Sequence, residues 1–268
     1  MMNIYDQEEC KKQHIIYVYN DLYKKDEASI DNKLVEELYK SLLLLNKYKK
    51  INLVLETGGG NLAAGTRLVK TLKSMYEEYE VTVLNRCHST GTLIAMASSQ
   101  LNILPKSILT PCEPQIDYND DNVSISLIRN LIENGLKDKI DIKTLGIYYS
   151  YINYFKDLCY QLYDKNKADK IINYMLYKVN SHQYPLSINE LLSLDVNVKL
   201  IEDLDEINYY LNEDSIIRSE LLDIKNDNEI ESPLTIIKDR NSTKTLIRKY
   251  KNKNNSYKQI YEGYIERR

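Results

Sequence analysis

The stretch VTVLNRCHSTGTLIAMASS, residues 81–99, joins two apolar runs through a short polar turn. Its first run, VTVLN, is short and rich in β-branched residues, which predicts a buried strand. Its second run, LIAMASS, predicts a helix that begins near Ser89. Upstream, INLVLE, TGGG and the segment from Leu62 repeat this order of strand, turn and helix. Repeated units of this kind predict an α/β domain with a largely parallel sheet.

The alternation of strands and helices continues to about residue 104, and other patterns follow it. We expect strands at residues 14–20 and 101–104 and helices at residues 30–48 and 62–76. From 122 to 180 the apolar spacing is helical, and residues 190–201 predict a helix followed by a strand. Residues 233–239 and 243–250 predict a hairpin. We therefore divide the chain into a main domain, 1–210, and a C-terminal extension, 211–268.

Composition and charge exclude several classes of protein. Of the 268 residues, 43% are hydrophobic and 28% charged, values close to globular averages, which excludes disorder and collagen-like structure. Lys and Arg number 36 against 39 Asp and Glu, a formal net charge of −3, which is too balanced for a general nucleic-acid surface. The start is charged and no apolar run approaches the roughly 18 residues that span a bilayer, so we expect a cytoplasmic protein without membrane association.

Cysteine spacing indicates neither a disulfide framework nor a metal site. The four cysteines are widely scattered and no CxxC pair occurs: Cys10, Cys87, Cys112 and Cys159. Cys87 and Cys112 lie near the motifs described below and are interpreted as packing residues. No P-loop or GxGxxG pattern follows a predicted strand, so we expect neither a nucleotide nor any other cofactor.

Two loops carry the candidate chemistry, because each follows a predicted strand and precedes a predicted helix, where α/β sheets present ligands. In the first loop, Gly58, Gly59 and Gly60 would let backbone N–H groups approach an anion or a developing oxyanion. A plain tight turn is the alternative. In the second loop, Ser89 stands at a strand-to-helix turn, where it is either a nucleophile or a helix N-cap.

Taken in order, four segments resemble the serine dehydrogenase proteinase family, a branch of the ClpP/SppA-like serine proteases. They are TGGG, HSTGTLIAMASS, LNILPKSILTPCEPQ and SHQYPLSINELLSLDV, and IDIKTL at 140–145 is similar to the family's IDDQTL. The resemblance covers about residues 14–200. It implies a ClpP/crotonase-like fold with repeated ββα-type units, a helical covering segment and a C-terminal extension. It also implies a serine endopeptidase-like hydrolase that cleaves peptides or proteins and assembles into homo-oligomers.

The resemblance assigns roles to individual residues. Ser89 matches the nucleophile that forms the acyl-enzyme, Gly59 and Gly60 match the oxyanion loop, and the N–H of Thr90 would be the second oxyanion donor. The general base stays open. His182 matches the family histidine.

Two lysines and a second histidine are the other candidates for the base. Lys137 and Lys139 lie at the distance from the serine at which SppA-like relatives carry their lysine. His88 adjoins Ser89 and is expected to project elsewhere.

The chain also departs from the family pattern. Gly58 replaces a proline, Thr90 a small residue, and Glu113 and Gln183 replace aspartates. Ser99 and Gln100 stand where acidic residues are usual. These losses motivate a second hypothesis, a catalytically degenerate oligomeric scaffold that binds a partner. A third hypothesis, chemistry on an acyl-CoA, has no use for the serine in the second loop.

Basic residues gather at the C-terminus. Residues 238–268 contain ten Lys or Arg against three acidic residues. Two interpretations fit this tail: a solvated terminus, or a segment that docks on an acidic partner or a nucleic acid.

Overall fold

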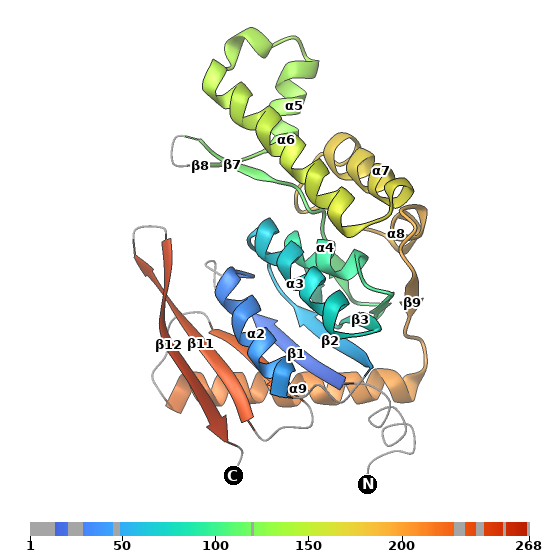
Figure 1. Cartoon of the computed structure of the whole chain (residues 1–268), viewed down its shortest axis with the longest axis vertical. Coiled ribbons are helices and arrows are strands. Elements are labelled where there is room, and N and C mark those ends of the chain that lie inside the picture. Colours follow the sequence, from blue (N-terminus) through green and yellow to red (C-terminus); the bar gives the residue numbers. More distant parts are fainter. Residues whose placement is uncertain are drawn as a thin grey trace. The chain divides into compact units, whose positions relative to one another are not determined.

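The computed structural model describes residues 14–20, 29–44, 49–118, 121–227, 234–239, 244–253 and 256–266. The chain forms two compact units, and the first combines Met1–Ile108 with Asn197–Arg268. The second unit is Leu109–Val196. A large sheet dominates the first unit, whereas the second is mainly helical (Figure 1).

An eight-stranded sheet is the framework of the first unit, in the order β12-β11-β10-β1-β2-β3-β5-β9. Five strands pair in parallel: β1 (His14–Asn20), β2 (Lys50–Glu56), β3 (Glu78–Val83), β5 (Gln100–Ile103) and β9 (Val198–Leu200). Three strands extend the sheet antiparallel beyond β1: β10 (Leu234–Asp239), β11 (Lys244–Lys253) and β12 (Ser256–Glu266). The predicted α/β class with a largely parallel sheet is confirmed.

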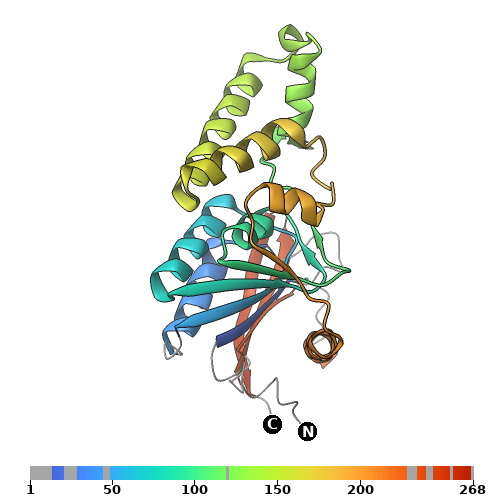
Figure 2. The same cartoon turned by 90° about the vertical axis from the view of Figure 1, so that its right-hand side faces the viewer.

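Helices cover both faces of this sheet. On one face lie α2 (Asn32–Leu44) and α3 (Leu62–Met75), and on the opposite face lies the long helix α9 (Leu204–Asp227), seen end-on in Figure 2. A short helix, α4 (Thr90–Met96), has every residue buried. It follows the two-residue strand β4 (Arg86–Cys87).

Burial on both faces explains why the sequence of the central strands is continuously apolar. In β2 every residue from Ile51 to Glu56 is buried, as expected for a parallel strand between two helical layers. Beneath α9, Tyr17, Val54 and Leu84 pack in one cluster with Ile217 of the helix. Hydrophobic burial therefore fixes α9 to the sheet.

The second unit begins with an antiparallel pair and continues as helices. The pair is β7 (Gln115–Tyr118) with β8 (Asp121–Ser124), which the sequence pattern did not predict. The helices are α5 (Ile125–Glu133), the 3₁₀ turn η1 (Lys137–Lys139), α6 (Ile142–Leu162), α7 (Lys165–Asn173), the π-helical turn η2 (Tyr174–Lys178) and α8 (Ile188–Ser193). Within the described ranges, none of the helices has both the length and the apolar character needed to cross a bilayer.

Most predicted elements occur close to their expected positions. β3 begins at Glu78 rather than at 81, and the predicted end of the first helix, residues 45–48, lies outside the described residues, as does Cys10. β10 and β11 pair at the position of the predicted hairpin. Residue 210 falls inside α9. The division into 1–210 and 211–268 stays a prediction, because strand pairing does not measure which segments fold independently.

Candidate active site

The glycine loop after β2 runs close against a neighbouring segment. Gly59 and Gly60 have φ angles of +110° and +147°, which residues with side chains rarely adopt. The N–H of Ile30 donates to the carbonyl of Gly59 at 2.8 Å, and the N–H of Asn61 donates to the carbonyl of Ile30 at 2.8 Å. A Cβ on Gly60 would lie 2.3 Å from the Ile30 oxygen. The path of the loop therefore requires both glycines.

Thr57 joins this loop to the loop that carries the candidate nucleophile. Its N–H donates to the carbonyl of Arg86 at 3.1 Å, and its carbonyl accepts from the N–H of His88 at 3.0 Å. Its hydroxyl accepts from the N–H of Gly59 at 3.1 Å. A Cβ on Gly91 would lie 2.4 Å from the Thr57 methyl carbon. The two loops that the sequence singled out separately therefore lie side by side.

Ser89 has a strained backbone at the junction of β4 and α4. Its φ is 51° and its ψ is −116°. Among the described residues, Asp195 is the only other non-glycine residue with a positive φ. Ser89 occupies the N-cap position of α4, but its side chain makes no capping hydrogen bond to the helix. A Cβ on Gly59 would lie 2.9 Å from the Ser89 Cβ and 3.5 Å from its Oγ. The serine is thus half-buried beside the glycine loop.

Backbone donors next to Ser89 suit a developing oxyanion. Within the described ranges, the N–H groups of Gly60 and Thr90 have no hydrogen-bond acceptor. The N–H of Gly59 is already held by the Thr57 hydroxyl. The Thr90 hydroxyl donates to the Gly60 carbonyl at 2.7 Å, which fixes the two segments relative to each other. Donors fixed before the reaction are what oxyanion stabilisation requires.

His182 lies in the second unit, where it interacts electrostatically with a buried carboxylate. Its side chain is half-buried, and its Nδ1 has no hydrogen-bond partner among the described residues. Burial lowers the pKa of His182, and the negative charge of Glu113 opposes that shift. Glu113 is 4% exposed. Its Oε1 accepts from the N–H of Ser126 at 2.6 Å, whereas no partner is found for Oε2 in the described part of the chain.

The sequence analysis counted Glu113 only as a departure from the family pattern and not as a candidate site residue. One feature of the sequence points to it: Glu113 of the CEPQ segment still carries a carboxylate at the position where the family has an aspartate. Within the second unit, this acid and the candidate histidine interact electrostatically. A carboxylate can orient an imidazole and stabilise its protonated form.

The loop that carries His182 is fixed at both ends. Arg129, 4% exposed, donates from Nη1 to the carbonyl of Leu176 at 2.5 Å and from Nη2 to the carbonyl of Val179 at 3.1 Å. At the other end, Glu190 accepts from the Tyr184 hydroxyl at 2.8 Å. Partial burial raises the pKa of Glu190, but hydrogen bonds from Ser187, Tyr174 and Tyr184 outweigh it and lower that pKa to about 2.

The candidate lysine bases also lie in the second unit. Lys137 and Lys139 form the 3₁₀ turn η1, in which no residue is buried. A lysine acts as a base near neutral pH only when burial or a cationic neighbour lowers its pKa. Both side chains are exposed.

The cysteines near the site are buried packing residues. Cys87 and Cys112 are each 0% exposed. Burial, assisted by the charge of Glu56, raises the pKa of the Cys87 thiol well above its ordinary value. Such a thiol is a poor nucleophile at neutral pH. Among the residues that the structure describes, no cluster of three or more His, Cys, Asp or Glu side chains could hold a metal ion.

Comparison with known proteins adds sequence relatives. The profile of the ClpP-like SDH-type serine proteinase family matches residues 2–213. The chain is 29% identical over 178 residues to uncharacterized protein MJ0137 of Methanocaldococcus jannaschii, and 25% identical over 170 residues to uncharacterized protein MJ1495 of the same organism. These matches cover 63% and 61% of this chain. They span only 61% and 56% of the relatives' own lengths.

Two solved structures are similar at low sequence identity. A variant of the 1510-N membrane-bound stomatin-specific protease, in complex with a substrate peptide, is 18% identical with a TM-score of 0.43. The match covers 67% of this chain and 74% of that one. ClpP1 from Listeria monocytogenes is 18% identical with a TM-score of 0.44, covering 76% of this chain and 99% of that one.

Proposed function

The chain belongs to the ClpP-like SDH-type serine proteinase family, as its ordered motifs predicted, and on that premise we propose that it is a serine peptidase that hydrolyses peptide bonds through an acyl-enzyme on Ser89. The observation that carries the proposal is the strained backbone of Ser89 against Gly59. Strain of this kind persists where the surrounding structure imposes it, and it concentrates at functional sites. A serine that only capped a helix would need none of it.

The proposed reaction follows the chemistry of acyl transfer. The Oγ of Ser89 attacks the peptide carbonyl carbon while the general base accepts its proton, giving a tetrahedral intermediate. The N–H groups of Gly60 and Thr90 stabilise the negative oxygen, and Gly59 leaves room for it beside the serine. The intermediate collapses, the protonated base gives its proton to the leaving amine, and an ester remains on Ser89. Water, activated by the same base, then releases the acid and restores the serine.

We assign the base to His182 and the orienting carboxylate to Glu113. Support comes from the second unit, where burial keeps the imidazole neutral and Glu113 offers an unpartnered oxygen. A neutral imidazole is a ready base at neutral pH. Lys137 and Lys139 remain the alternative bases, and their exposure argues against them.

A degenerate scaffold with the same fold is the second candidate. Gln183 and Ser99 are the substitutions that favour it. Ser99, however, has a structural role, since its hydroxyl donates to the Tyr79 carbonyl at 2.7 Å. The proposal also includes a peptide or protein substrate, a homo-oligomeric assembly, a cytoplasmic location and an acidic partner for the basic C-terminal segment.

Digestion of unfolded casein and of a mixed peptide library tests the function. New peptide termini, identified by mass spectrometry, are expected with the wild-type protein and not with Ser89→Ala or His182→Ala. Lys137→Ala serves as the matched control and should retain cleavage. Cleavage that survives His182→Ala but not Lys137→Ala would transfer the base to the lysine. Absence of cleavage by the folded wild-type protein would favour the scaffold.

A further inference from the structure

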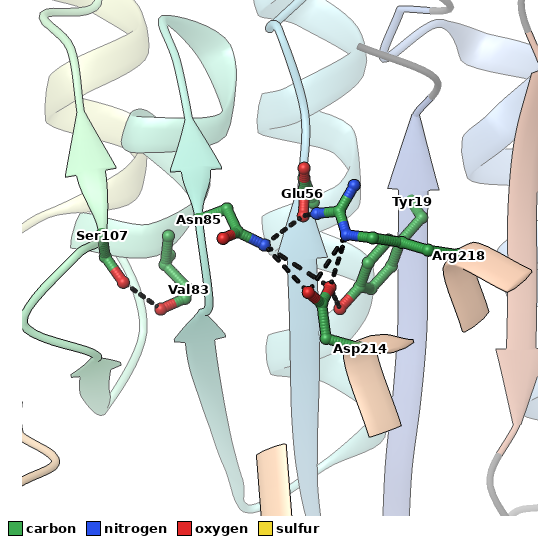
Figure 3. A network of polar contacts seen from close by, with 7 residues as sticks. All are labelled: Tyr19, Glu56, Val83, Asn85, Ser107, Asp214 and Arg218. Carbon is green, nitrogen blue, oxygen red and sulfur yellow. Dashed lines mark hydrogen bonds and ion pairs between the residues drawn. The ribbon is translucent and has the colours of Figure 1, made fainter. Parts of the chain in front are cut away.

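A buried polar network connects α9 to the ends of the central strands (Figure 3). Arg218 forms an ion pair with Glu56 through Nη2, and its Nε lies 3.0 Å from Oδ2 of Asp214. The Tyr19 hydroxyl donates to Oδ1 of Asp214 at 3.0 Å. Asn85 donates through Nδ2 to Oε2 of Glu56 at 3.0 Å and to Oδ2 of Asp214 at 3.3 Å. Helix α9 is thus bonded to the ends of β1 and β2 and to the chain just beyond β3.

Two members of this network stand at the beginning of the two site loops. Glu56 is the last residue of β2, and the glycine loop starts at the next residue, Thr57. Asn85 follows β3 and lies four residues before Ser89. The bond between their side chains therefore ties the start of the oxyanion loop to the start of the nucleophile loop.

Burial makes the network sensitive to the loss of any charge. Glu56 is 2% exposed and Asp214 is 7% exposed. Burial lowers the pKa of the Arg218 guanidinium, but hydrogen bonds and charge attraction from Glu56 and Asp214 outweigh it and raise that pKa. Burial and the two carboxylates also raise the pKa of Tyr19, so its hydroxyl stays protonated and donates.

Stability alone does not explain why such a network is placed here. A buried ion cluster is weak evidence for stability, since well-packed apolar residues of similar volume often do as well or better. Helix α9 already packs through the apolar cluster that includes Ile217 and Tyr210. Polar networks add directional constraints that apolar packing lacks. The constraint in this case acts on the starts of both site loops.

We propose that Arg218 and Asp214 are positioning residues, which hold Glu56 and Asn85 in place and thereby set the glycine loop at the right distance from Ser89. This inference rests on the proposed function only in that Ser89 is taken as the nucleophile. Neither residue touches the reacting atoms. Both act from α9, an element that carries none of the predicted catalytic groups.

The other end of α9 offers a matched control. Glu206 is 8% exposed and pairs with Lys199 of β9 at 3.0 Å. This pair also anchors α9 to the sheet and is also partly buried. Among the described residues, the hydrogen bonds of the Glu206 carboxylate go to Lys199 and not to either site loop. Glu206→Gln therefore removes an anchor of the helix without removing the contact to Glu56 or Asn85.

The experiment compares Arg218→Lys, Asp214→Asn and Glu206→Gln with the wild-type full chain. Hydrogen exchange of peptides covering 56–61 and 84–91 measures how firmly the two loops are held in place, independently of activity. Labelling by a fluorophosphonate probe, at a temperature well below each melting point, gives kinact and KI separately. Arg218→Lys keeps the charge but loses the two-pronged geometry of the guanidinium, so it is expected to fold.

In the two network variants we expect faster exchange in both loops and a fall of about 10- to 100-fold in kinact. KI should stay unchanged, and Glu206→Gln should behave as the wild type. Folded network variants with wild-type exchange and kinact would overturn the inference, as would equal losses in Glu206→Gln. If the wild-type protein shows no label on Ser89, the proposed function fails, whereas the exchange result still decides whether the network positions the loops.

Discussion

Replacing Ser89 by glycine is expected to stabilise the protein while it removes the nucleophile. At φ 51° and ψ −116° the backbone of Ser89 lies in a region that glycine enters freely and other residues do not. Strain at such positions costs about 1–3 kcal/mol. Glycine also has more conformational freedom in the unfolded chain, which offsets about 0.5–1 kcal/mol of the stabilisation gained by relieving the strain. We therefore expect Ser89→Gly to gain about 0.5–2 kcal/mol in the free energy of unfolding.

Urea unfolding of the wild type, Ser89→Gly and Ser89→Ala measures this effect. Alanine is the matched control, because it removes the hydroxyl but keeps the Cβ and therefore the backbone strain. Its stability should stay within about 0.5 kcal/mol of the wild type. The gain with glycine corresponds to a rise of roughly 1–8 °C in Tm. If Ser89→Gly is no more stable than Ser89→Ala, the backbone at Ser89 is not strained and the main support for the nucleophile is lost.

Further outcomes are expected for two glycines and for His182. Gly59→Ala places a Cβ 2.9 Å from the Ser89 Cβ at a φ of +110°, so the fluorophosphonate labelling rate should fall about 100-fold. By contrast, Gly146→Ala in α6 meets nothing within 4 Å and should add up to about 1 kcal/mol to the free energy of unfolding in denaturant titrations. Because burial lowers the pKa of His182, the labelling rate should stay flat down to about pH 6.5 and fall only below it, and Glu113→Gln should move that fall to still lower pH. A fall in labelling centred above pH 8 would contradict His182 as the base. The lowered pKa of His182 also means that the folded state loses stability as pH falls from about 6.5 towards the folded pKa. Tm measured against pH would reveal this loss.

The strand and helix order of the first unit could be predicted because its hydrophobic pattern is strong. Parallel strands buried on both faces, such as β2, leave continuous apolar runs that stand out from the helices. β3 was expected to begin later because it starts with exposed Glu78, which breaks the apolar run.

Helix α9 was not predicted from the sequence for a related reason. Its buried residues include the charged side chains of Glu206 and Asp214 beside Tyr210 and Ile217. Charges on the buried face cancel much of the apolar periodicity on which helix prediction depends. The polar network of α9 has partners far away in the sequence, such as Glu56, so no local sequence pattern predicts it. β12 was missed because its sequence, SYKQIYEGYIE, mixes charged and aromatic residues without a clear apolar run.

The candidate site was predicted in part. Ordered motifs identified the glycine loop and Ser89, but residue types alone could not separate a nucleophile from an N-cap. That choice depends on the backbone angles of Ser89 and on its missing cap hydrogen bond. Glu113 was interpreted as a loss because it replaces an aspartate, whereas its burial and its electrostatic interaction with His182 are the basis on which we propose it as the orienting carboxylate.

The most direct test of the central claim is a mass-spectrometric map of the residue that a fluorophosphonate probe modifies in the purified full chain. We predict an adduct on Ser89 alone, formed at neutral pH, absent in Ser89→Ala and strongly slowed in His182→Ala. No adduct in a folded wild-type sample, or an adduct on another serine that persists in Ser89→Ala, would contradict the claim that Ser89 is an activated nucleophile.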